Sequence, residues 1–161
     1  MTVKRAVSGR QSAGLLLYRR NGNGVEVLLG HPGGPFWRNK DLHSWSIPKG
    51  LIVEGEKPLA AAKREFTEET GHRPRGKSLP LGEARQPGGK LVQVWAVEDD
   101  WDAASLKSNM FEMEWPPRSG RRHSFPELDR AEWFDFAEAH TKILKGQAIF
   151  LTRLLEKLAG E

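Results

Sequence analysis

Short apolar segments separated by turn-forming residues predict several β-strands. Residues 11–20 and 25–30 are rich in Leu and Val, and the sequence NGNG lies between them. Because Asn and Gly tolerate positive φ angles, these segments predict a β-hairpin. Residues 79–85 and 90–98 flank the turn-forming sequence QPGG, so they predict a second hairpin.

Alternation and aromatic content predict further strands. Residues 109–115 (NMFEMEW) alternate in side-chain type with the period of a strand, and residues 131–136 (AEWFDF) are apolar and aromatic. Residues 44–48 (SWSIP) are also strand-like. The segments 31–43 and 116–126 are rich in Gly and Pro and predict loops.

Two helical segments are predicted. In residues 58–70, Pro58 suits the first helical position, good helix formers follow, and Gly71 can cap the end. The predicted core-facing stripe of this helix is Leu59, Ala62 and Phe66. A second helix is predicted over residues 137–159, with a break near Gly146. Its predicted apolar face is Ile149, Leu151, Leu154, Leu155 and Leu158.

The order of these elements predicts a mixed α/β protein. Strands precede one helix, more strands follow, and a helix ends the sequence, so a mixed sheet with helices on both faces would bury the apolar positions. No repeat or interdomain linker interrupts the 161 residues, which predicts a single domain over residues 1–161. Residues 1–10 predict a short, basic, flexible tail.

The composition excludes several classes of protein. Hydrophobic residues make up 38% and charged residues 29%, which is typical of a globular protein and not of a disordered one. The absence of cysteine excludes disulfides, thiol catalysis and cysteine-ligated zinc, and it agrees with a cytoplasmic location. No signal-like segment and no membrane-spanning run is present, so a membrane partner is not expected.

The charge balance is mildly basic. Lysine and arginine number 25 against 21 acidic residues, which gives a net charge of +4 and a pI of about 9.5. A basic surface suits polyanionic ligands such as nucleotides, RNA or inositol phosphates, although a merely solubilising charge explains the excess equally well. Basic residues cluster at 118–122 (RSGRR).

The candidate chemistry lies in the first predicted helix. Glu65, Glu68 and Glu69 occur at i, i+3 and i+4, so they share one helix face and repel one another. Arg64 can offset part of this charge, and a divalent cation would offset more. Oxygen ligands without cysteine or histidine select Mg²⁺, Mn²⁺ or Ca²⁺, and Mg²⁺ completes its shell with water and substrate phosphates. A solvated acidic helix face is the alternative interpretation.

Neighbouring residues favour the metal site over the solvated face. The preceding loop contains Gly50, Gly55 and the further carboxylate Glu56, and Lys49 stands where a cation could meet phosphate oxygens. The sequence therefore predicts a phosphate-bearing substrate.

Residues 50–72 resemble the Nudix box, G-x5-E-x7-R-E-U-x-E-E-x-G-U, in which U is a bulky aliphatic residue. The positions that match are Gly50, Glu56, Arg64, Glu65, Glu68, Glu69 and Gly71. Phe66 takes the first U position, and His72 takes the last, where an aliphatic residue is usual. The order of predicted elements also resembles the Nudix α/β/α sandwich with a mixed β-sheet.

This resemblance implies a hydrolase that cleaves a phosphoanhydride in a nucleoside diphosphate linked to another group. Glu65, Glu68 and Glu69, with the carbonyl of Gly50, would bind Mg²⁺ or Mn²⁺. Glu56 and Arg64 would orient these ligands. The general base would be Glu65 or Glu68, or a loop glutamate as in some family members. The loop candidates are Glu112, Glu114 and Glu127.

The substrate is less well defined. The sequence WSIPKG, followed by Gly55-Glu56, resembles the version typical of dinucleoside polyphosphate hydrolases such as those that cleave diadenosine tetraphosphate. That version also occurs in RNA 5′-pyrophosphohydrolases, diphosphoinositol polyphosphate phosphohydrolases and nucleotide pyrophosphatases. An oxidised or ordinary nucleoside triphosphate, the 5′ end of an RNA, and a non-catalytic nucleotide-sensing module remain alternatives. The sequence leaves the oligomeric state open.

Residues outside the box are candidates for substrate contacts. Exposed aromatic side chains could stack on a base, and basic side chains could bind phosphates, although structural or solvated roles explain them equally well. Trp45 is expected to pack at a strand end. The candidates for a base contact are Phe36 and Trp37, with Phe125 near the basic loop. The candidates for phosphate contacts are Lys49, Arg118, Arg121 and Arg122.

Overall fold

A mixed β-sheet lies at the centre of the protein. The computed structural model describes residues 11–22 and 24–161, so the tail predicted at 1–10 lies outside the described residues. Within the described part, the sheet has six strands in the order β4-β5-β1-β2-β8, with β3 paired to β1. These strands are β1 (Gln11–Asn21), β2 (Gly24–Pro32), β3 (Lys49–Leu51), β4 (Ser78–Arg85), β5 (Leu91–Glu98) and β8 (Leu128–Asp135).

The strand pairings confirm both predicted hairpins. Strand β1 pairs antiparallel with β2, with Asn21 opposite Gly24 at the turn. Strands β4 and β5 are antiparallel and are joined through the 3₁₀ turn η1 (Pro87–Gly89). Strand β1 runs parallel to β5, and this pairing makes the sheet mixed.

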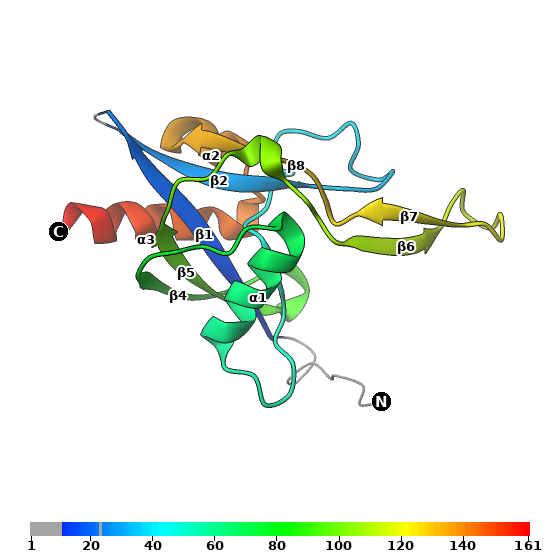
Figure 1. The fold of residues 1–161 in the computed structure, drawn as a ribbon, viewed down its shortest axis with the longest axis horizontal. Coiled ribbons are helices and arrows are strands. Elements are labelled where there is room, and N and C mark those ends of the chain that lie inside the picture. The colour runs from blue at the N-terminus through cyan, green and yellow to red at the C-terminus, as the bar shows by residue number, and fades with distance from the viewer. Residues whose placement is uncertain (1–10, 23) are drawn as a thin grey trace.

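Helices cover both faces of the sheet, as the sequence predicted. Helix α1 (Pro58–Thr70) lies on one face, and α2 (Phe136–Lys142) with α3 (Ala148–Ala159) lies on the other (Figure 1). Successive residues of β1 point to opposite faces, so Leu15 packs in the cluster with Phe66 while Leu16 packs in the cluster with Phe150. Both leucines are fully buried, which contributes about 1.5–3 kcal/mol each. The fold is an α/β/α sandwich.

Helix α1 begins and ends where the sequence predicts. Pro58 is at the first turn, and Gly71 has φ 80° and donates its N–H to the Thr67 carbonyl at 2.8 Å. The buried residues are Ala61, Ala62, Phe66 and Thr70. Leu59 is only partly buried, so the predicted stripe was wrong at that position.

The C-terminal helix is interrupted more widely than predicted. Residues 143–147, which include the 3₁₀ turn η3 (Lys145–Gln147), separate α2 from α3 because segment 44–46 docks there: Leu144 donates its N–H to the Trp45 carbonyl at 2.8 Å. The predicted apolar face was wrong for Ile149 and Leu155, which are 42% and 43% exposed, and Phe150 is buried instead.

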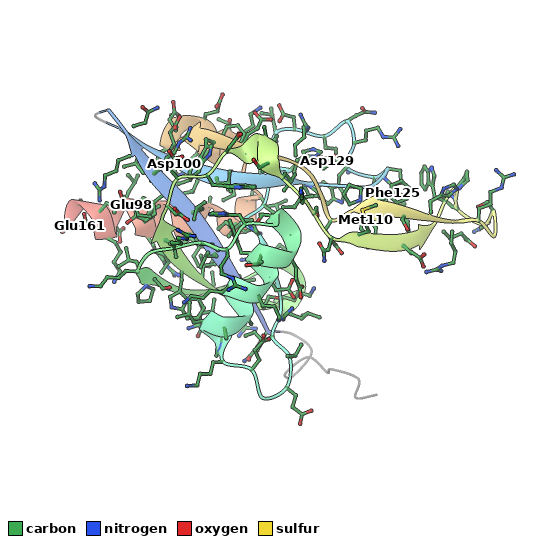
Figure 2. The ribbon with its side chains drawn as sticks, viewed as in Figure 1. Glu98, Asp100, Met110, Phe125, Asp129 and Glu161 are labelled. Atoms are coloured by element: carbon green, nitrogen blue, oxygen red, sulfur yellow. The ribbon has the colours of Figure 1, made fainter. Side chains whose placement is uncertain are left out.

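A third hairpin, made of β6 (Met110–Glu114) and β7 (Arg122–Pro126), extends away from the sheet (Figure 1). Met110 and Phe125 lie on it in Figure 2. The loop predicted over 116–126 was wrong for 122–126, because polar side chains on an exposed strand give no apolar alternation. Strand β8 likewise begins before the predicted residue 131, at Leu128.

Three smaller features complete the fold. Segment 44–48 forms only isolated bridges, Gly30 to Ser46 and Trp45 to Ile143, and the expected packing role of Trp45 is confirmed by its 1% exposure. A short 3₁₀ turn, η2 (Ala103–Ser105), lies beside β8. In the part of the chain that the structure describes, no helix is long and apolar enough to cross a membrane.

Candidate active site

Close contact between β3 and α1 places the first acidic side chain. Gly50 lies on β3, opposite Ala13 of β1, and the carboxylate of Glu65 lies directly against it. A Cβ atom on residue 50 would come within 2.1 Å of the Glu65 Cδ atom. Glycine at this position is therefore what allows the Glu65 carboxylate to reach the strand.

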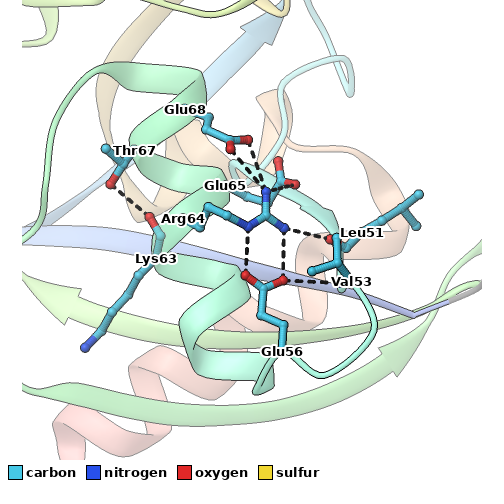
Figure 3. A network of polar contacts seen from close by, with 8 residues as sticks. All are labelled: Leu51, Val53, Glu56, Lys63, Arg64, Glu65, Thr67 and Glu68. Carbon is cyan, nitrogen blue, oxygen red and sulfur yellow. Dashed lines mark hydrogen bonds and ion pairs between the residues drawn. The ribbon is translucent and has the colours of Figure 1, made fainter. Parts of the chain in front are cut away.

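Arg64 connects the carboxylates around it (Figure 3). Its Nε and Nη2 atoms donate to the two oxygens of Glu56 at 2.7 and 3.1 Å. Its Nη1 atom donates to Glu65 Oε1 at 2.9 Å and to both oxygens of Glu68 at 3.2 Å. Hydrogen bonds and the charges of these carboxylates raise the pKa of Arg64. The guanidinium thus fixes the loop residue Glu56 relative to the acidic face of α1.

Glu69 lies deeper in the same cluster. Burial, followed by the negative charges of Glu65 and Glu127, raises the pKa of Glu69 to about 8. The positive charge of Lys49 acts in the opposite direction and lowers the pKa of Glu69. Burial also lowers the pKa of Lys49, although Glu69 partly offsets that effect. The structure therefore brings Lys49 into the cluster.

The structure separates the three loop glutamates that the sequence could not rank. Glu127 follows β7 directly, its pKa is raised by burial, and its charge acts on Glu69. Glu112 instead pairs with Arg122 at 3.6 Å, and Glu114 accepts the backbone N–H of Arg118 at 2.8 Å. Of the three, Glu127 is the one that joins the acidic cluster.

An aromatic cavity of about 340 Å³ adjoins Glu127. Its walls are the loop 32–37 and the inner face of β6, so Phe36 and Trp37 lie in it as the sequence suggested. Phe36 is 57% exposed and contacts Trp115 edge-to-face at 5.4 Å. Sequence reasoning missed Phe111 and Met113, although their alternation along β6 placed them on one face.

Gly33 holds the cavity loop against the turn that carries Glu127. The N–H of Gly33 donates to the Glu127 carbonyl at 2.9 Å. A Cβ atom on residue 33 would lie 1.9 Å from the Pro126 carbonyl oxygen. This close backbone approach places the aromatic wall and the acidic cluster side by side.

The predicted phosphate-binding arginines lie elsewhere. Arg118 and Arg121 lie in the loop that joins β6 to β7, at the far end of the hairpin (Figure 1), and Arg122 begins β7 opposite Glu114. The structure does not bring them to the acidic cluster. Phe125 packs against Phe111 within the hairpin, with ring centroids 6.0 Å apart.

The acidic cluster offers a set of oxygen donors to a divalent metal. In the described residues, no three acidic or histidine side chains converge as a preformed metal cage would, and Arg64 binds both Glu65 and Glu68. The chemistry of the set nevertheless fits Mg²⁺ or Mn²⁺, since it consists of carboxylates beside a backbone carbonyl. The pKa of Glu69 is raised first by burial and then by the charges of Glu65 and Glu127, and a cation would offset those charges. The metal roles of Gly50, Glu65, Glu68 and Glu69 stay predictions.

His72, the departure from the box, has a local explanation. Its ring stacks on Trp101 with centroids 5.2 Å apart, and its Nε2 atom lies 2.9 Å from Asp99 Oδ2. A stacked and hydrogen-bonded histidine therefore fills the space after α1.

The fold and the site together define a class: an α/β/α protein with an acidic, oxygen-rich cluster on a helix beside a cavity lined by aromatic side chains. The NUDIX domain model matches residues 9–154, so the chain belongs to the NUDIX family. The RNA pyrophosphohydrolase of Roseobacter denitrificans is 31% identical over 109 residues, which are 68% of this chain. The chain spans about half of that relative, 54% of its length.

Solved structures share the fold. An Ap4A hydrolase from Caenorhabditis elegans, in a binary complex, matches with a TM-score of 0.67 at 21% identity, covering 93% of this chain and 99% of that one. The NUDIX domain of Shewanella oneidensis NrtR, complexed with ADP ribose, matches with a TM-score of 0.65 at 16% identity, covering 92% and 87%.

Proposed function

We propose that this protein is a Mg²⁺- or Mn²⁺-dependent pyrophosphohydrolase that cleaves a phosphoanhydride in a nucleoside diphosphate linked to another group. The observation that carries the proposal is the position of Glu127, which joins the acidic cluster of α1 to the aromatic cavity. A ligand with a base in this cavity would have its phosphates at the carboxylates.

Each part of the site has a proposed task. The base stacks against Phe36 and Trp37, and Lys49 meets the phosphate chain. Glu56 and Arg64 orient the acidic face of α1. Glu65, Glu68 or Glu127 accepts the proton of the attacking water, and the position of Glu127 beside the cavity favours it over the other loop glutamates. Arg118, Arg121 and Arg122 would contact only a substrate that extends along the hairpin.

Glu65, Glu68 and Glu69, with the Gly50 carbonyl, would hold the metal. When bound there, Mg²⁺ or Mn²⁺ supplies positive charge to the phosphate oxygens and lowers the pKa of a water molecule.

A dinucleoside polyphosphate such as diadenosine tetraphosphate is the leading substrate. The sequence WSIPKG supports this choice, and the Ap4A hydrolase of C. elegans shares the fold. The 5′ end of an RNA is the second candidate, supported by the basic hairpin end and by the RNA pyrophosphohydrolases among the relatives. A nucleoside triphosphate is the third, since an 8-oxo-(d)GTP phosphatase of Mycolicibacterium smegmatis is 36% identical over 76 residues, 45% of this chain and 23% of that protein.

A substrate panel with Mg²⁺ tests the proposal. Diadenosine polyphosphates, ordinary and oxidised nucleotides, 5′-triphosphorylated RNA and diphosphoinositols are incubated with the protein, and products are separated by chromatography. We expect AMP and ATP from diadenosine tetraphosphate.

Two variants identify the catalytic group. We expect Glu68→Gln to lower kcat by roughly 10²-fold or more with the fold intact, whereas Glu114→Gln, on the outer face of β6, leaves kcat unchanged. Near-wild-type turnover by Glu68→Gln would refute the assignment. Tight nucleotide binding without metal, with no product after long incubation, would indicate a sensing module instead.

A further inference from the structure

A second cavity, of about 310 Å³, lies away from the acidic helix. Its floor contains Trp45 and Phe134, which belong to the core cluster shared with α2 and α3. The acidic cluster lies on α1, which packs on the opposite face of the sheet through Phe66. The second cavity is therefore separate from the candidate active site.

Four cationic side chains line this cavity against two acidic ones, Asp41 and Glu132. The cationic side chains are Arg38, Lys40, Arg130 and Lys142. Asp41 is already engaged, since it pairs with Lys142 and accepts the indole N–H of Trp45 at 2.8 Å. In the described residues, Arg38 and Lys40 form no ion pair, and the Lys40 ammonium lies over the Trp37 ring, 5.0 Å from its centroid. Arg130 also pairs with Asp129 at 3.7 Å and with Glu132 at 4.0 Å, and the lining as a whole still has two more cationic than acidic side chains.

Two of the four cationic groups, Arg130 and Lys142, are held in place before any ligand arrives. The Arg130 guanidinium lies over the Trp45 ring, 5.1 Å from its centroid, and the Trp45 side chain is almost completely buried. Lys142 is fixed by its pair with Asp41. Fixed donors lose little conformational freedom on binding, so they favour an anion more than mobile surface lysines do.

The buried side chain of His31 connects loop 38–41 to β8, the two segments that carry most of the charged residues of the cavity. The ring nitrogens of His31 lie 2.7 Å from Asp129 Oδ1 and 2.6 Å from the Lys40 carbonyl oxygen. His31 is fully buried, so these hydrogen bonds tie loop 38–41 to β8 beside Arg130. The shape of the cavity is thus set by the interior of the protein.

From these features we propose that this cavity is a second binding site for a phosphate group. Guanidinium and ammonium donors at several points around one cavity match the several oxygens of a phosphate. Two sources share this chemistry: the terminal phosphate of a free nucleotide and the phosphodiester of an RNA strand. The site does not depend on hydrolysis or on the metal, so its failure leaves the proposed function untouched.

The test follows the Trp45 indole N–H by NMR in the full-length, metal-free protein. This group is at the cavity floor and donates to Asp41, so it reports on this site rather than on the acidic cluster. Inorganic phosphate, AMP and a short RNA without terminal phosphates are titrated at constant ionic strength. We expect a saturable shift of the Trp45 signal. Saturation by phosphate and AMP alone identifies a terminal phosphate, whereas saturation by the RNA alone identifies a phosphodiester.

Matched variants assign the donors. We expect Arg38→Gln combined with Arg130→Gln to weaken binding by roughly tenfold or more, because each loses a charged hydrogen bond. Lys157→Gln removes an exposed charge on α3 and is expected to bind as the wild type does. A Trp45 signal that does not move with any of the three ligands would overturn the proposal, as would unchanged binding by the double variant.

Discussion

Because Gly50 has no side chain, the Glu65 carboxylate can lie against the backbone of residue 50. In Gly50→Ala the new Cβ atom would come within 2.1 Å of Glu65 Cδ, so the carboxylate must move. We expect kcat to fall by roughly 10²-fold, the usual cost of misplacing a reacting group by about 1 Å. Steady-state kinetics with Mg²⁺ and the best substrate of the panel measures this effect.

Gly24→Ala is the control for this variant. A Cβ atom at residue 24 would meet only the Asn21 carbonyl oxygen, at 3.8 Å, so we expect unchanged kcat. Equal activity of Gly50→Ala and Gly24→Ala would mean that the position of Glu65 is irrelevant to turnover.

The buried charge of Glu69 makes stability depend on pH. The pKa of Glu69 is raised from its ordinary 4.5 to about 8, so the folded state binds more protons than the unfolded state between these values. The free energy of unfolding of the metal-free protein therefore falls as pH rises through this window, by at most about 1.4 kcal/mol per pH unit from this group. Urea denaturation from pH 5 to pH 8 measures the slope.

Glu69→Gln removes this titration. We expect the variant to show a smaller loss of stability between pH 5 and pH 8 than the wild type, since the amide stays neutral. A variant with the same slope as the wild type would show that another group titrates.

At the residue scale, the box spacing could predict the acidic cluster because helical periodicity fixes which side chains share a face. Spacing alone could not choose Glu127 over Glu112 and Glu114. That choice depends on the strand register of β6 with β7. The register places Glu114 opposite Arg122 in the ladder, and Glu127 follows the last residue of β7. Phe111 and Met113 were missed for the same reason, because β6 had no predicted partner.

At the scale of elements, the contact between loop 32–37 and the β7–β8 turn positions the aromatic cavity. Gly33→Ala would place a Cβ atom 1.9 Å from the Pro126 carbonyl oxygen, and no rotamer can relieve a clash with backbone. We expect a loss of about 1–3 kcal/mol in the free energy of unfolding and a raised KM with a smaller change in kcat. Urea denaturation and steady-state kinetics measure both.

Gly160→Ala, at the end of α3, serves as the comparison, because its Cβ would meet neighbours only at 3.7 Å. Stability and KM of Gly33→Ala that match those of Gly160→Ala would argue against a positioning role for this loop contact.

Elements with local signals were predicted well, and elements fixed by distant contacts were not. Helix α1 has both ends marked by its own residues, Pro58 and Gly71, so its bounds agree with the prediction. The break between α2 and α3 is widened by Trp45, about a hundred residues away, which no local pattern could reveal. Strand β7 is stabilised by pairing with β6 rather than by burial, so it lacked the expected apolar alternation.

For the whole molecule, the basic hairpin end distinguishes the candidate substrates. Arg118 and Arg121 lie in the loop that joins β6 to β7, so we expect a 5′-triphosphorylated RNA to reach them and a free nucleotide at the acidic cluster not to. We expect kcat/KM for such an RNA to fall with salt, and replacing both arginines by Gln to reduce the slope by about 0.7 for each lost phosphate contact.

Diadenosine tetraphosphate provides the comparison for this experiment. Its turnover is expected to be indifferent to the two arginines. If the RNA is cleaved with the same salt dependence before and after the substitution, the hairpin end does not bind the strand.

The guanidinium of Arg64 bears on the order in which the protein folds and binds metal. Arg64 pairs with Glu56, Glu65 and Glu68 and so supplies a positive charge within the chain itself. We therefore expect the chain to fold without a bound metal ion. On the proposed function, we therefore expect the metal to bind reversibly to a protein that is already folded. Protein prepared without magnesium is then expected to be folded and inactive, and to gain activity when the metal is added.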